Sequence, residues 1–464
     1  MGFQVNQYKN IAIIGCGAGG GTSAQFARKT DRNSNIVVFE KGKYPQYSKC
    51  GLPYVLSGNI PEFDDLIEFS EEWFKKANIN LLMETKVDQI DVKNKLVIAK
   101  KGNIIVEKPY NSLIISTGSK PIVPPIQNIK IGEELVEGVY ALRTIDDAKK
   151  ISKFIEKGKK ATIIGAGLIG LEMADCLHKD GMDVTVVESM STVLPNTLDK
   201  DMSNIVQEVI SEKIMLYTGY LAIKIESKDR KIKKIFIKNI KTSEEKIVDT
   251  DLLIIATGTK PEISLAKKAG CKIGKTGGII VNDKSETSMK DIFAVGDCTE
   301  YFDFVTKEPI SIGLGSIVVR QGITAGINAA GGNYRLKKGF LQTCTSEFFN
   351  IELASVGPSI KNLENSSIIS GRFKGHSLPD YYPGGKSITI KVIIDKKTGC
   401  IHAAQAVGSN AAQRINTLAC AVLNEMDVDT FRNLETAYAP PIAPTLDVMT
   451  LACDVASIKL KRRQ

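Results

Sequence analysis

The chain has 464 residues, of which 43% are hydrophobic and 24% are charged. It is therefore long enough for about three globular domains, and its composition excludes disordered, collagen-like and fibrous proteins. The net charge of +9, from 61 basic and 52 acidic residues, is spread along the chain and forms no basic stripe, which argues against nucleic acid as a partner.

The first predicted element is a short strand that runs into a glycine-rich loop. Residues 11–21 read IAIIGCGAGGG, a β-branched strand followed by G-x-G-x-x-G and a helical stretch. In such a loop the first glycine permits a tight turn, the second lets the backbone approach a pyrophosphate, and the third lets helix and strand pack closely. The next strand ends at Glu40, where a dinucleotide ribose needs a hydrogen-bond acceptor. The loop glycines are Gly15, Gly17 and Gly20.

A helix is predicted to begin near Cys50. Pro53 is followed by the apolar-rich residues 54–56, and proline favours the first turn of a helix. The sulfur of Cys50 would then lie at the positive end of the helix dipole beside Lys49, and both features favour the thiolate. We therefore expect a lowered pKa and a nucleophilic cysteine. The alternative, a buried structural cysteine, is the interpretation that fits most of the other cysteines.

A second copy of the glycine pattern begins at residue 161. Residues 161–172 read ATIIGAGLIGLE, and the following strand, 183–188, ends at Glu188. Because both copies combine a strand, the loop, a helix and a later carboxylate, glycine-rich turns without a nucleotide are the weaker interpretation. Glu188 favours NADH over NADPH, since a carboxylate accepts ribose hydroxyls and repels a 2′-phosphate. The loop glycines of this copy are Gly165, Gly167 and Gly170.

Three more segments are predicted to be closing strands of these two folds. Residues 112–121 (SLIISTGSKP) and 251–261 (DLLIIATGTKP) are apolar strands that end in Thr-Gly, and residues 291–298 (DIFAVGDC) end in Gly-Asp-Cys. The carboxylate of Asp297 could accept a hydrogen bond from a polyol hydroxyl or cap the helix that follows. The chain is therefore expected to leave the first fold for the second and to return to it through Asp297.

The composition changes from Phe340 onward. Glycine loops disappear, and strands at 388–394 and 401–407 are followed by a run with helical apolar spacing at 411–423. We predict an α/β protein with two Rossmann-like dinucleotide-binding domains and a C-terminal α+β domain. The expected domain limits are 1–145 with 282–335 for the first, 146–281 for the second and 336–464 for the third.

Targeting, membrane and metal-binding signals are absent from the sequence. The first apolar run, 11–14, is cut short by glycines and lacks a cleavage site, so no signal peptide is predicted. No segment holds enough uninterrupted apolar residues to cross a membrane. The nine cysteines form no C-x-x-C pair and the three histidines lie far apart in the sequence, so neither a disulfide framework nor a metal site is expected. We predict a cytoplasmic protein.

At these positions the chain resembles the pyridine nucleotide-disulfide oxidoreductases, and the resemblance covers nearly its whole length. It implies FAD on the first fold, NAD(P)H on the second and a homodimer formed through the C-terminal domain. For FAD it implies contacts with Gly15, Gly17, Ala18, Gly20, Glu40, Lys41, Val87, Thr117, Gly118, Arg143 and Asp297. For the nicotinamide nucleotide it implies contacts with Gly165, Gly167, Ile169, Gly170, Glu188 and Gly258.

The redox centre selects a branch of that family. Members of the glutathione reductase type carry C-x-x-x-x-C, but here position 45 is proline and Cys50 stands alone. This pattern resembles the branch of coenzyme A-disulfide reductases, NADH oxidases and NADH peroxidases, in which the cysteine cycles through a mixed disulfide or a sulfenic acid. The oxidases and peroxidases typically place a histidine in the first glycine loop, whereas this loop has Ala18. Disulfide chemistry is therefore favoured over peroxide chemistry.

Two tyrosine segments near the C-terminus carry a further resemblance. Residues 437–447 (AYAPPIAPTLD) resemble the Tyr-x-Pro-Pro segment of the coenzyme A-disulfide reductases, and residues 381–384 (YYPG) resemble their second tyrosine motif. The resemblance implies that Tyr438, Tyr381 and Tyr382 reach across the dimer towards the cysteine, and Tyr438 could protonate a departing thiolate. A packing or turn role for these tyrosines is the alternative.

The expected function is an FAD-dependent NAD(P)H oxidoreductase that reduces a disulfide, persulfide or polysulfide through Cys50. An NADH oxidase or peroxidase that reduces O₂ or peroxide through a cysteine sulfenic acid is the alternative, and a signalling flavoprotein with negligible turnover is a third. A coenzyme A substrate stays open, because Phe26 stands where coenzyme A-binding members usually place an arginine. Nearby cations could contact a substrate phosphate or could simply be exposed, namely Arg28, Lys29 and Lys43.

Overall fold

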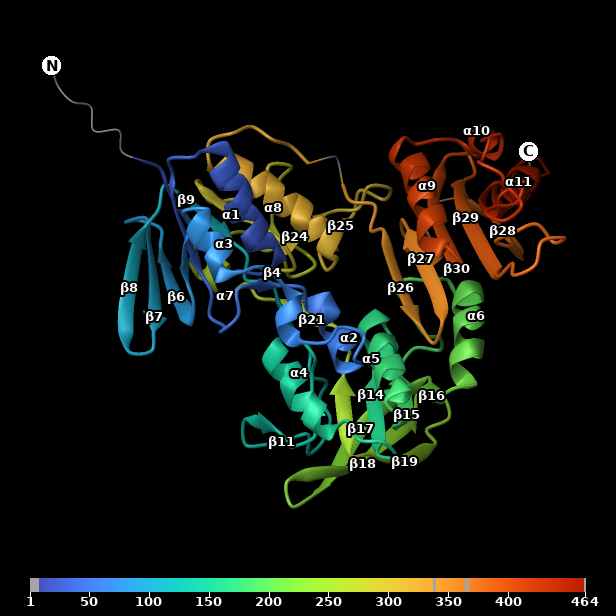
Figure 1. Cartoon of the computed structure of the whole chain (residues 1–464), viewed down its shortest axis with the longest axis horizontal. Coiled ribbons are helices and arrows are strands. Elements are labelled where there is room, and N and C mark those ends of the chain that lie inside the picture. The colour runs from blue at the N-terminus through green and yellow to red at the C-terminus, as the bar shows by residue number, and fades with distance from the viewer. Residues whose placement is uncertain (1–7, 337–338, 364–366, 463–464) are drawn as a thin grey trace.

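A parallel five-stranded sheet forms the centre of the first unit (Figure 1). The computed structural model describes residues 8–336, 339–363 and 367–462. The strands of this sheet are nearly continuous apolar runs, as expected where a parallel sheet is covered on both faces. Their order across the sheet is β23 (Ile292–Ala294), β9 (Ser112–Ile115), β1 (Asn10–Ile14), β2 (Asn35–Phe39) and β5 (Asn80–Leu82).

Helices cover one face of this sheet and an antiparallel sheet covers the other. α1 (Ala18–Thr30) packs against α8 (Gly315–Ala329), and the two helices bury small apolar side chains against β1 and β2. On the opposite face, side chains of the antiparallel sheet, such as Val97, pack in one core with Phe39. That sheet consists of β6 (Thr85–Asp91), β7 (Leu96–Lys101) and β8 (Ile104–Pro109).

The second unit repeats the first around another parallel five-stranded sheet. Its order is β13 (Val139–Tyr140), β20 (Leu252–Ile255), β14 (Lys160–Ile164), β15 (Asp183–Glu188) and β16 (Met215–Thr218). Because β23 comes after this unit in the sequence yet pairs with β9, the chain returns to the first sheet as predicted. The unit also contains α5 (Leu168–Lys179), α6 (Lys200–Ser211), β17 (Tyr220–Lys228), β18 (Lys231–Asn239) and β19 (Glu245–Asp249).

Short elements complete the two units, and one pair of them connects the units. An antiparallel ribbon pairs β10 (Ser119–Pro121) with β21 (Thr259–Pro261), so the segments that follow the two Thr-Gly dipeptides meet. The other short elements are β3 (Gln46–Tyr47), α2 (Leu52–Leu56), β4 (Ile67–Phe69), α3 (Glu71–Lys76), β11 (Lys130–Ile131), β12 (Glu134–Leu135), α4 (Ile145–Ile151), α7 (Ser264–Lys268), β22 (Ile279–Ile280), β24 (Thr299–Phe302) and β25 (Pro309–Ser311).

The third unit is an antiparallel sheet with helices, shown in orange and red in Figure 1. The predicted helix at 411–423 is confirmed as α9 (Ala411–Leu423), and the two predicted strands are confirmed to within one residue at their ends. The α/β fold class with two Rossmann-like units and an α+β unit is therefore confirmed. The sheet order is β26 (Cys344–Phe348), β27 (Ile351–Val356), β30 (Ile401–Gly408), β29 (Ser387–Asp395) and β28 (Ile368–His376).

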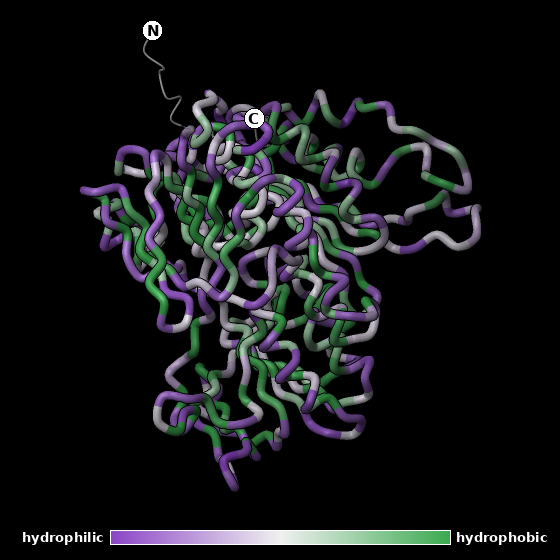
Figure 2. The backbone as a smooth tube through the Cα atoms, turned by 60° about the vertical axis from the view of Figure 1, so that its left-hand side comes forward, coloured by the Kyte–Doolittle hydropathy of each residue, from purple (hydrophilic) through white to green (hydrophobic). Residues whose placement is uncertain are grey.

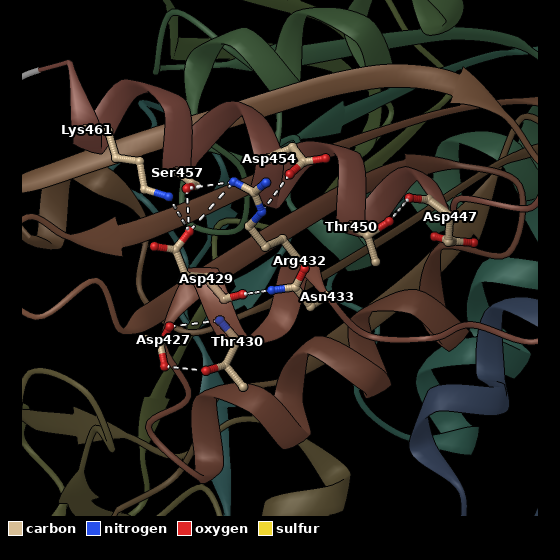
Figure 3. A network of polar contacts seen from close by, with 10 residues as sticks. All are labelled: Asp427, Asp429, Thr430, Arg432, Asn433, Asp447, Thr450, Asp454, Ser457 and Lys461. Carbon is tan, nitrogen blue, oxygen red and sulfur yellow. Dashed lines mark hydrogen bonds and ion pairs between the residues drawn. The ribbon is translucent and has the colours of Figure 1, made fainter.

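Polar contacts fix the last two helices of the third unit to each other. α10 (Val428–Arg432) and α11 (Val448–Lys461) pack together, and Arg432 lies between them, 2.9 Å from the carboxylate of Asp454 and 3.0 Å from Ser457 (Figure 3). At the start of α11, Asp447 forms a buried ion pair with Arg414 at 2.8 Å. The segment that carries Tyr438 therefore ends at an anchored carboxylate.

The second and third units share a hydrophobic core. Phe348 and Leu353 of the third unit are fully buried in one cluster with Leu194 and Leu198 of the second. A buried ion pair crosses the same boundary, where the Lys391 ammonium lies 3.0 Å from Asp199. In Figure 2 hydrophobic segments are concentrated inside the molecule, and many of the outer loops are hydrophilic. Among the described helices, none combines the length and the apolar character needed to cross a membrane.

Candidate active site

The first glycine loop has the shape of a dinucleotide cradle. Gly15 has φ +97°, and a Cβ there would lie 2.3 Å from the carbonyl oxygen of Ser116. A Cβ on Gly20 would lie 1.9 Å from the carbonyl oxygen of Gly15, so both positions require glycine. A Cβ on Gly17 would meet nothing within 4 Å. This residue caps the N-terminus of α1, whose first residue is the half-buried Ala18. The space beside Gly17 and the free amides of the helix start fit a pyrophosphate.

The carboxylate of Glu40 lies beside this loop. It accepts hydrogen bonds from the backbone amides of Cys16, at 2.8 Å, and Gly42, at 2.7 Å. These bonds fix the acidic side chain at the edge where a ribose would lie. The resemblance also implies FAD contacts for Lys41 and Val87. Lys41 is exposed, and Val87 is buried in β6.

The second glycine loop repeats the geometry of the first. Gly165 has φ +104°, and Cβ atoms on Gly165 and Gly170 would lie 2.4 and 2.0 Å from backbone oxygens, whereas one on Gly167 would meet nothing within 4 Å. The buried Glu188 accepts hydrogen bonds from the amides of Ala166 and Met190, both at 2.8 Å. Ile169, in the first turn of α5, is 45% exposed. The loop therefore fits a second dinucleotide.

The two Thr-Gly dipeptides join the two dinucleotide folds. The Thr117 hydroxyl donates to the carbonyl oxygen of Glu262 at 2.6 Å, and the Thr257 hydroxyl donates to that of Ile122 at 2.8 Å. Gly118 and Gly258 have φ +67° and +96°, a backbone conformation that favours glycine. These segments therefore fix how one loop faces the other.

Arg143 and Asp297 form an ion pair next to the first fold. Their side chains form an ion pair at 2.5 Å and are 20% and 19% exposed, and the Ser119 hydroxyl donates to Asp297 at 2.9 Å. The Nε of Arg143 is buried and has no hydrogen-bond partner among the described residues. A buried donor left without a partner fits a ligand rich in acceptors, such as FAD. The capping alternative for Asp297 is wrong, because the strand β24 follows it and not a helix.

Cys50 lies between the two folds. It is exposed, in a 3-10 turn (Lys49–Gly51) that leads into α2, and α2 packs against α5 of the second fold. The other cysteines are also unpaired, and five of them are buried. Among the described residues no cluster could hold a metal ion. Cys50 is thus the cysteine that lies at the junction of both cofactor folds.

The prediction of a lowered pKa for Cys50 is wrong for the chain by itself. Although the residue reaches solvent, the protein packed around its sulfur excludes water from much of it and so raises the pKa of the thiol, and the charges of Glu172 and Asp297 raise it further, while those of Arg143 and Lys49 act in the opposite direction. Burial also lowers the pKa of Lys49. The helix α2 has only five residues, so its dipole is small. Ionisation of this thiol therefore depends on groups that are distant in the sequence.

Glu172 is a site residue that the sequence interpretation missed. It lies on α5, and burial raises the pKa of its carboxyl group. The only signal was its place two residues after Gly170 in the second loop motif. That place alone does not show on which side of α5 the side chain lies. Its electrostatic effect on Cys50 depends on the packing of α2 on α5.

The tyrosines lie apart from Cys50 within one chain. The hydroxyls of Tyr381 and Tyr438 are 2.7 Å apart, and Tyr381, Tyr382 and Tyr438 are 71%, 37% and 47% exposed. The connection between β28 and β29, which carries Tyr381 and Tyr382, extends away from α2 (Figure 1). The structure therefore brings two of the three tyrosines together and leaves them accessible to another molecule.

Arg28 serves the fold and leaves no free guanidinium for a phosphate. Its nitrogens donate to the carbonyl oxygens of Asp31, Arg32, Ser34, Ala77 and Asn78, at 2.7 to 3.1 Å. This contradicts the expectation that Arg28 could contact a substrate. Lys29 lies over the Phe26 ring, 4.6 Å from its centroid, and Lys43 is exposed.

Comparison with known proteins agrees with this geometry. Residues 9–321 match the family described as pyridine nucleotide-disulphide oxidoreductase, and residues 343–449 match its dimerisation domain. The chain is 39% identical to the NADH oxidase of Methanocaldococcus jannaschii, over 97% of this chain and 99% of the relative. It is 31% identical to the NAD(P)H coenzyme A polysulfide/persulfide reductase of Pyrococcus horikoshii, over 97% and 99%. The solved NAD-dependent persulfide reductase from A. fulgidus superposes with a TM-score of 0.92 at 34% identity, over 98% of this chain and 84% of that one.

Proposed function

The chain belongs to the pyridine nucleotide-disulphide oxidoreductases, which use FAD and NAD(P)H, and we propose that it reduces a disulfide, persulfide or polysulfide through Cys50. The observation that carries the proposal is the place of this exposed cysteine, in the turn that leads into α2, which packs against α5 of the second fold. Relatives named as persulfide reductases support it. Anaerobic NADH consumption with such an acceptor is the test.

The first fold supplies the residues that would hold FAD. Three features fit its pyrophosphate, ribose and polar groups: the open space beside Gly17, the fixed carboxylate of Glu40, and the Nε of Arg143, which has no partner in the described part of the chain. Bound there, the flavin supplies two-electron transfer between a nicotinamide and sulfur. The remaining proposed contacts are Gly15, Ala18, Gly20, Lys41, Val87, Thr117, Gly118 and Asp297 for FAD, and Gly165, Gly167, Ile169, Gly170, Glu188 and Gly258 for the nicotinamide nucleotide.

Cys50 carries the sulfur chemistry. Its thiolate attacks one sulfur of the substrate disulfide, so that the substrate S–S bond breaks, a mixed disulfide with Cys50 forms, and one thiolate leaves and takes a proton. Two electrons that originate from NAD(P)H then cleave the mixed disulfide, which releases the second thiol and restores Cys50. A persulfide or polysulfide follows the same course with a hydrosulfide or shorter sulfur chain as a leaving group.

We propose that the chain acts as a homodimer and that Tyr438 protonates the departing thiolate at the partner's cysteine. The match to the dimerisation domain supports the dimer, and the segment near Tyr438 exposes Ile442 at 73% and Leu446 at 60%, which a second subunit could cover. The domain limits of 1–145 with 282–335, 146–281 and 336–464, and the cytoplasmic location, stay predictions.

Replacing Tyr438 with phenylalanine is expected to lower kcat by about a hundredfold, because a positioned proton donor contributes that much or more. The loss should be largest with a substrate whose leaving thiol has a high pKa. Steady-state rates with a series of aryl and alkyl disulfides measure this. Tyr334→Phe is the matched control, since Tyr334 is also 47% exposed. Equal losses for all leaving groups would rule out proton donation by Tyr438.

NADH is the proposed electron donor, in preference to NADPH. Glu188 is buried at the second loop, and among the described residues it accepts hydrogen bonds only from neutral groups, including the Ser189 hydroxyl at 3.1 Å. A 2′-phosphate would meet this carboxylate without a compensating cation. We expect kcat/KM for NADH to exceed that for NADPH by at least about tenfold, or about 1.4 kcal/mol, and Glu188→Gln to narrow the difference. Faster oxidation of NADPH than of NADH would contradict the assignment.

Reduction of O₂ or peroxide is the second candidate function. The relative from M. jannaschii, named NADH oxidase, favours it. In that case peroxide would oxidise the Cys50 thiolate to a sulfenic acid, and two electrons from NAD(P)H with two protons would return it to the thiol and release water. The two functions differ in whether NADH is consumed without O₂ when a disulfide or polysulfide is supplied.

A further inference from the structure

A hydrogen bond joins the C-terminal unit to the site of Cys50. The Ser346 hydroxyl donates to Oε1 of Glu172 at 2.6 Å. Ser346 lies on β26 of the third unit and is only 8% exposed, whereas Glu172 lies on α5 of the second. Ser346 is the single hydrogen-bond donor that Glu172 has within the part of the chain that the structure describes. Its hydroxyl therefore fixes where this carboxylate lies.

The helix α5 places that carboxylate next to the cysteine turn. α5 packs against α2 on one side and against β26 on another, and Figure 1 shows α2 and α5 side by side. The charge of Glu172 is the largest electrostatic cause, after burial, that raises the pKa of Cys50, and it has the same rank for the pKa of Tyr54 on α2. Glu172 therefore lies within electrostatic reach of Cys50, on a helix that packs against the helix following the cysteine turn.

Glu172 differs from the other carboxylate near Cys50 in its lack of a cation. Asp297 is paired with Arg143 at 2.5 Å, so its charge is largely compensated. Glu172 forms no ion pair among the described residues, and its only fixed partner is the neutral hydroxyl of Ser346. The titratable and charged groups that act electrostatically on Cys50 are Lys49 of its own turn, Tyr54 of α2, Arg143 before α4, Glu172 of α5 and Asp297 after β23.

We propose that Ser346 is a positioning residue, whose hydroxyl fixes the Glu172 carboxylate beside the Cys50 turn and so links the dimerisation unit to the reactivity of the cysteine. The inference rests on the proposed function, in which Cys50 is the reacting group. Without the hydroxyl, the carboxylate loses its partner and turns towards water, where its charge is screened. The Cys50 thiol then ionises more readily.

The test is the pH dependence of Cys50 alkylation. The purified full-length protein is reduced with dithiothreitol, desalted and treated with iodoacetamide from about pH 6 to about pH 10, a range that spans thiol ionisation. Mass spectrometry of the peptide that contains Cys50 separates its rate from those of other cysteines. Because only the thiolate reacts, a raised pKa keeps the rate low at neutral pH, and removal of a nearby negative charge moves the midpoint to lower pH.

Five variants make the test specific. Glu172→Gln should lower the midpoint by about half a pH unit to one pH unit, and Ser346→Ala should lower it by a smaller amount. Ser346→Thr, which keeps the hydroxyl, should retain the wild-type midpoint. In the double variant, Ser346→Ala should add nothing to Glu172→Gln, since its effect passes through that carboxylate. Ser355→Ala, at another buried serine on the neighbouring strand β27, should change nothing.

An unchanged midpoint in Ser346→Ala, or a shift that persists in the Glu172→Gln background, would overturn the proposal. A shift of the same size in Ser355→Ala would also do so, because it would point to loosened packing of the sheet. The measurement does not need turnover. Full activity in a Cys50 variant would refute the proposed function, whereas an unchanged alkylation midpoint in Ser346→Ala would refute the positioning role. The two failures are therefore distinguishable.

Discussion

Replacing Cys50 with serine is expected to abolish disulfide reduction while FAD stays bound. Serine has nearly the same size, so the 3-10 turn and its packing against α5 should persist. Its hydroxyl is a far weaker nucleophile than a thiolate and cannot form a mixed disulfide. Removal of a catalytic nucleophile costs about 10⁴-fold to 10⁶-fold in characterised enzymes, and we expect at least about a thousandfold loss in kcat/KM for the disulfide.

Two readouts separate loss of chemistry from loss of structure in this variant. Flavin absorbance per chain should equal that of the wild type, and electron transfer from NADH to ferricyanide, which needs no cysteine, should continue. Cys420→Ser is the matched control, since Cys420 is also exposed but lies on α9 of the third unit. Retention of most disulfide reductase activity in Cys50→Ser would remove Cys50 from the mechanism.

A methyl group at Gly17 is expected to remove FAD and leave the fold intact. Gly17 has φ −73° and ψ −171°, which alanine adopts easily, and its Cβ would meet no protein atom within 4 Å. Alanine at this helix start costs about 1 kcal/mol or less. The methyl group would instead occupy the space where the pyrophosphate approaches. We expect at least about a tenfold weaker FAD affinity, or about 1.4 kcal/mol.

Alanine substitutions at Gly20 and Gly167 serve as comparisons for Gly17→Ala. On Gly20 the methyl group would lie 1.9 Å from a backbone oxygen, so Gly20→Ala should lower the Tm by many degrees or prevent folding. Gly167→Ala, at the equivalent open position of the second loop, should keep FAD and raise KM for NADH. Flavin absorbance per chain, Tm and KM measure the three outcomes. Full FAD content in Gly17→Ala would place the pyrophosphate elsewhere.

The sequence predicted the parts of the site that depend on local pattern. Each glycine loop lies within one strand–turn–helix segment, and the spacing of its glycines already reflects the close approach of backbone atoms seen at Gly20 and Gly170. The carboxylates of Glu40 and Glu188 follow each loop at the end of the next strand, and parallel pairing of β1 with β2 and of β14 with β15 brings them back to the loop. The positions of these two carboxylates could therefore be predicted from strands that are neighbours in the sequence.

The sequence could not predict the electrostatics of Cys50. The neighbouring Lys49 and the helix start suggested a lowered pKa, but the sign is set by burial and by Glu172 and Asp297, which lie far away in the chain. The sequence around Arg28 also does not indicate that its guanidinium donates to five carbonyl oxygens of two loops. The contact of Ser346 with Glu172 spans two units, so only the folded arrangement reveals it.

The most direct measurement is NADH consumption in the absence of O₂, with coenzyme A disulfide, an inorganic polysulfide or a small persulfide as acceptor. The wild-type protein should oxidise NADH in proportion to the acceptor supplied, and Cys50→Ser should not. A rate that is the same in both proteins, or NADH oxidation that begins only when O₂ is admitted, would contradict a sulfur reductase that acts through this cysteine.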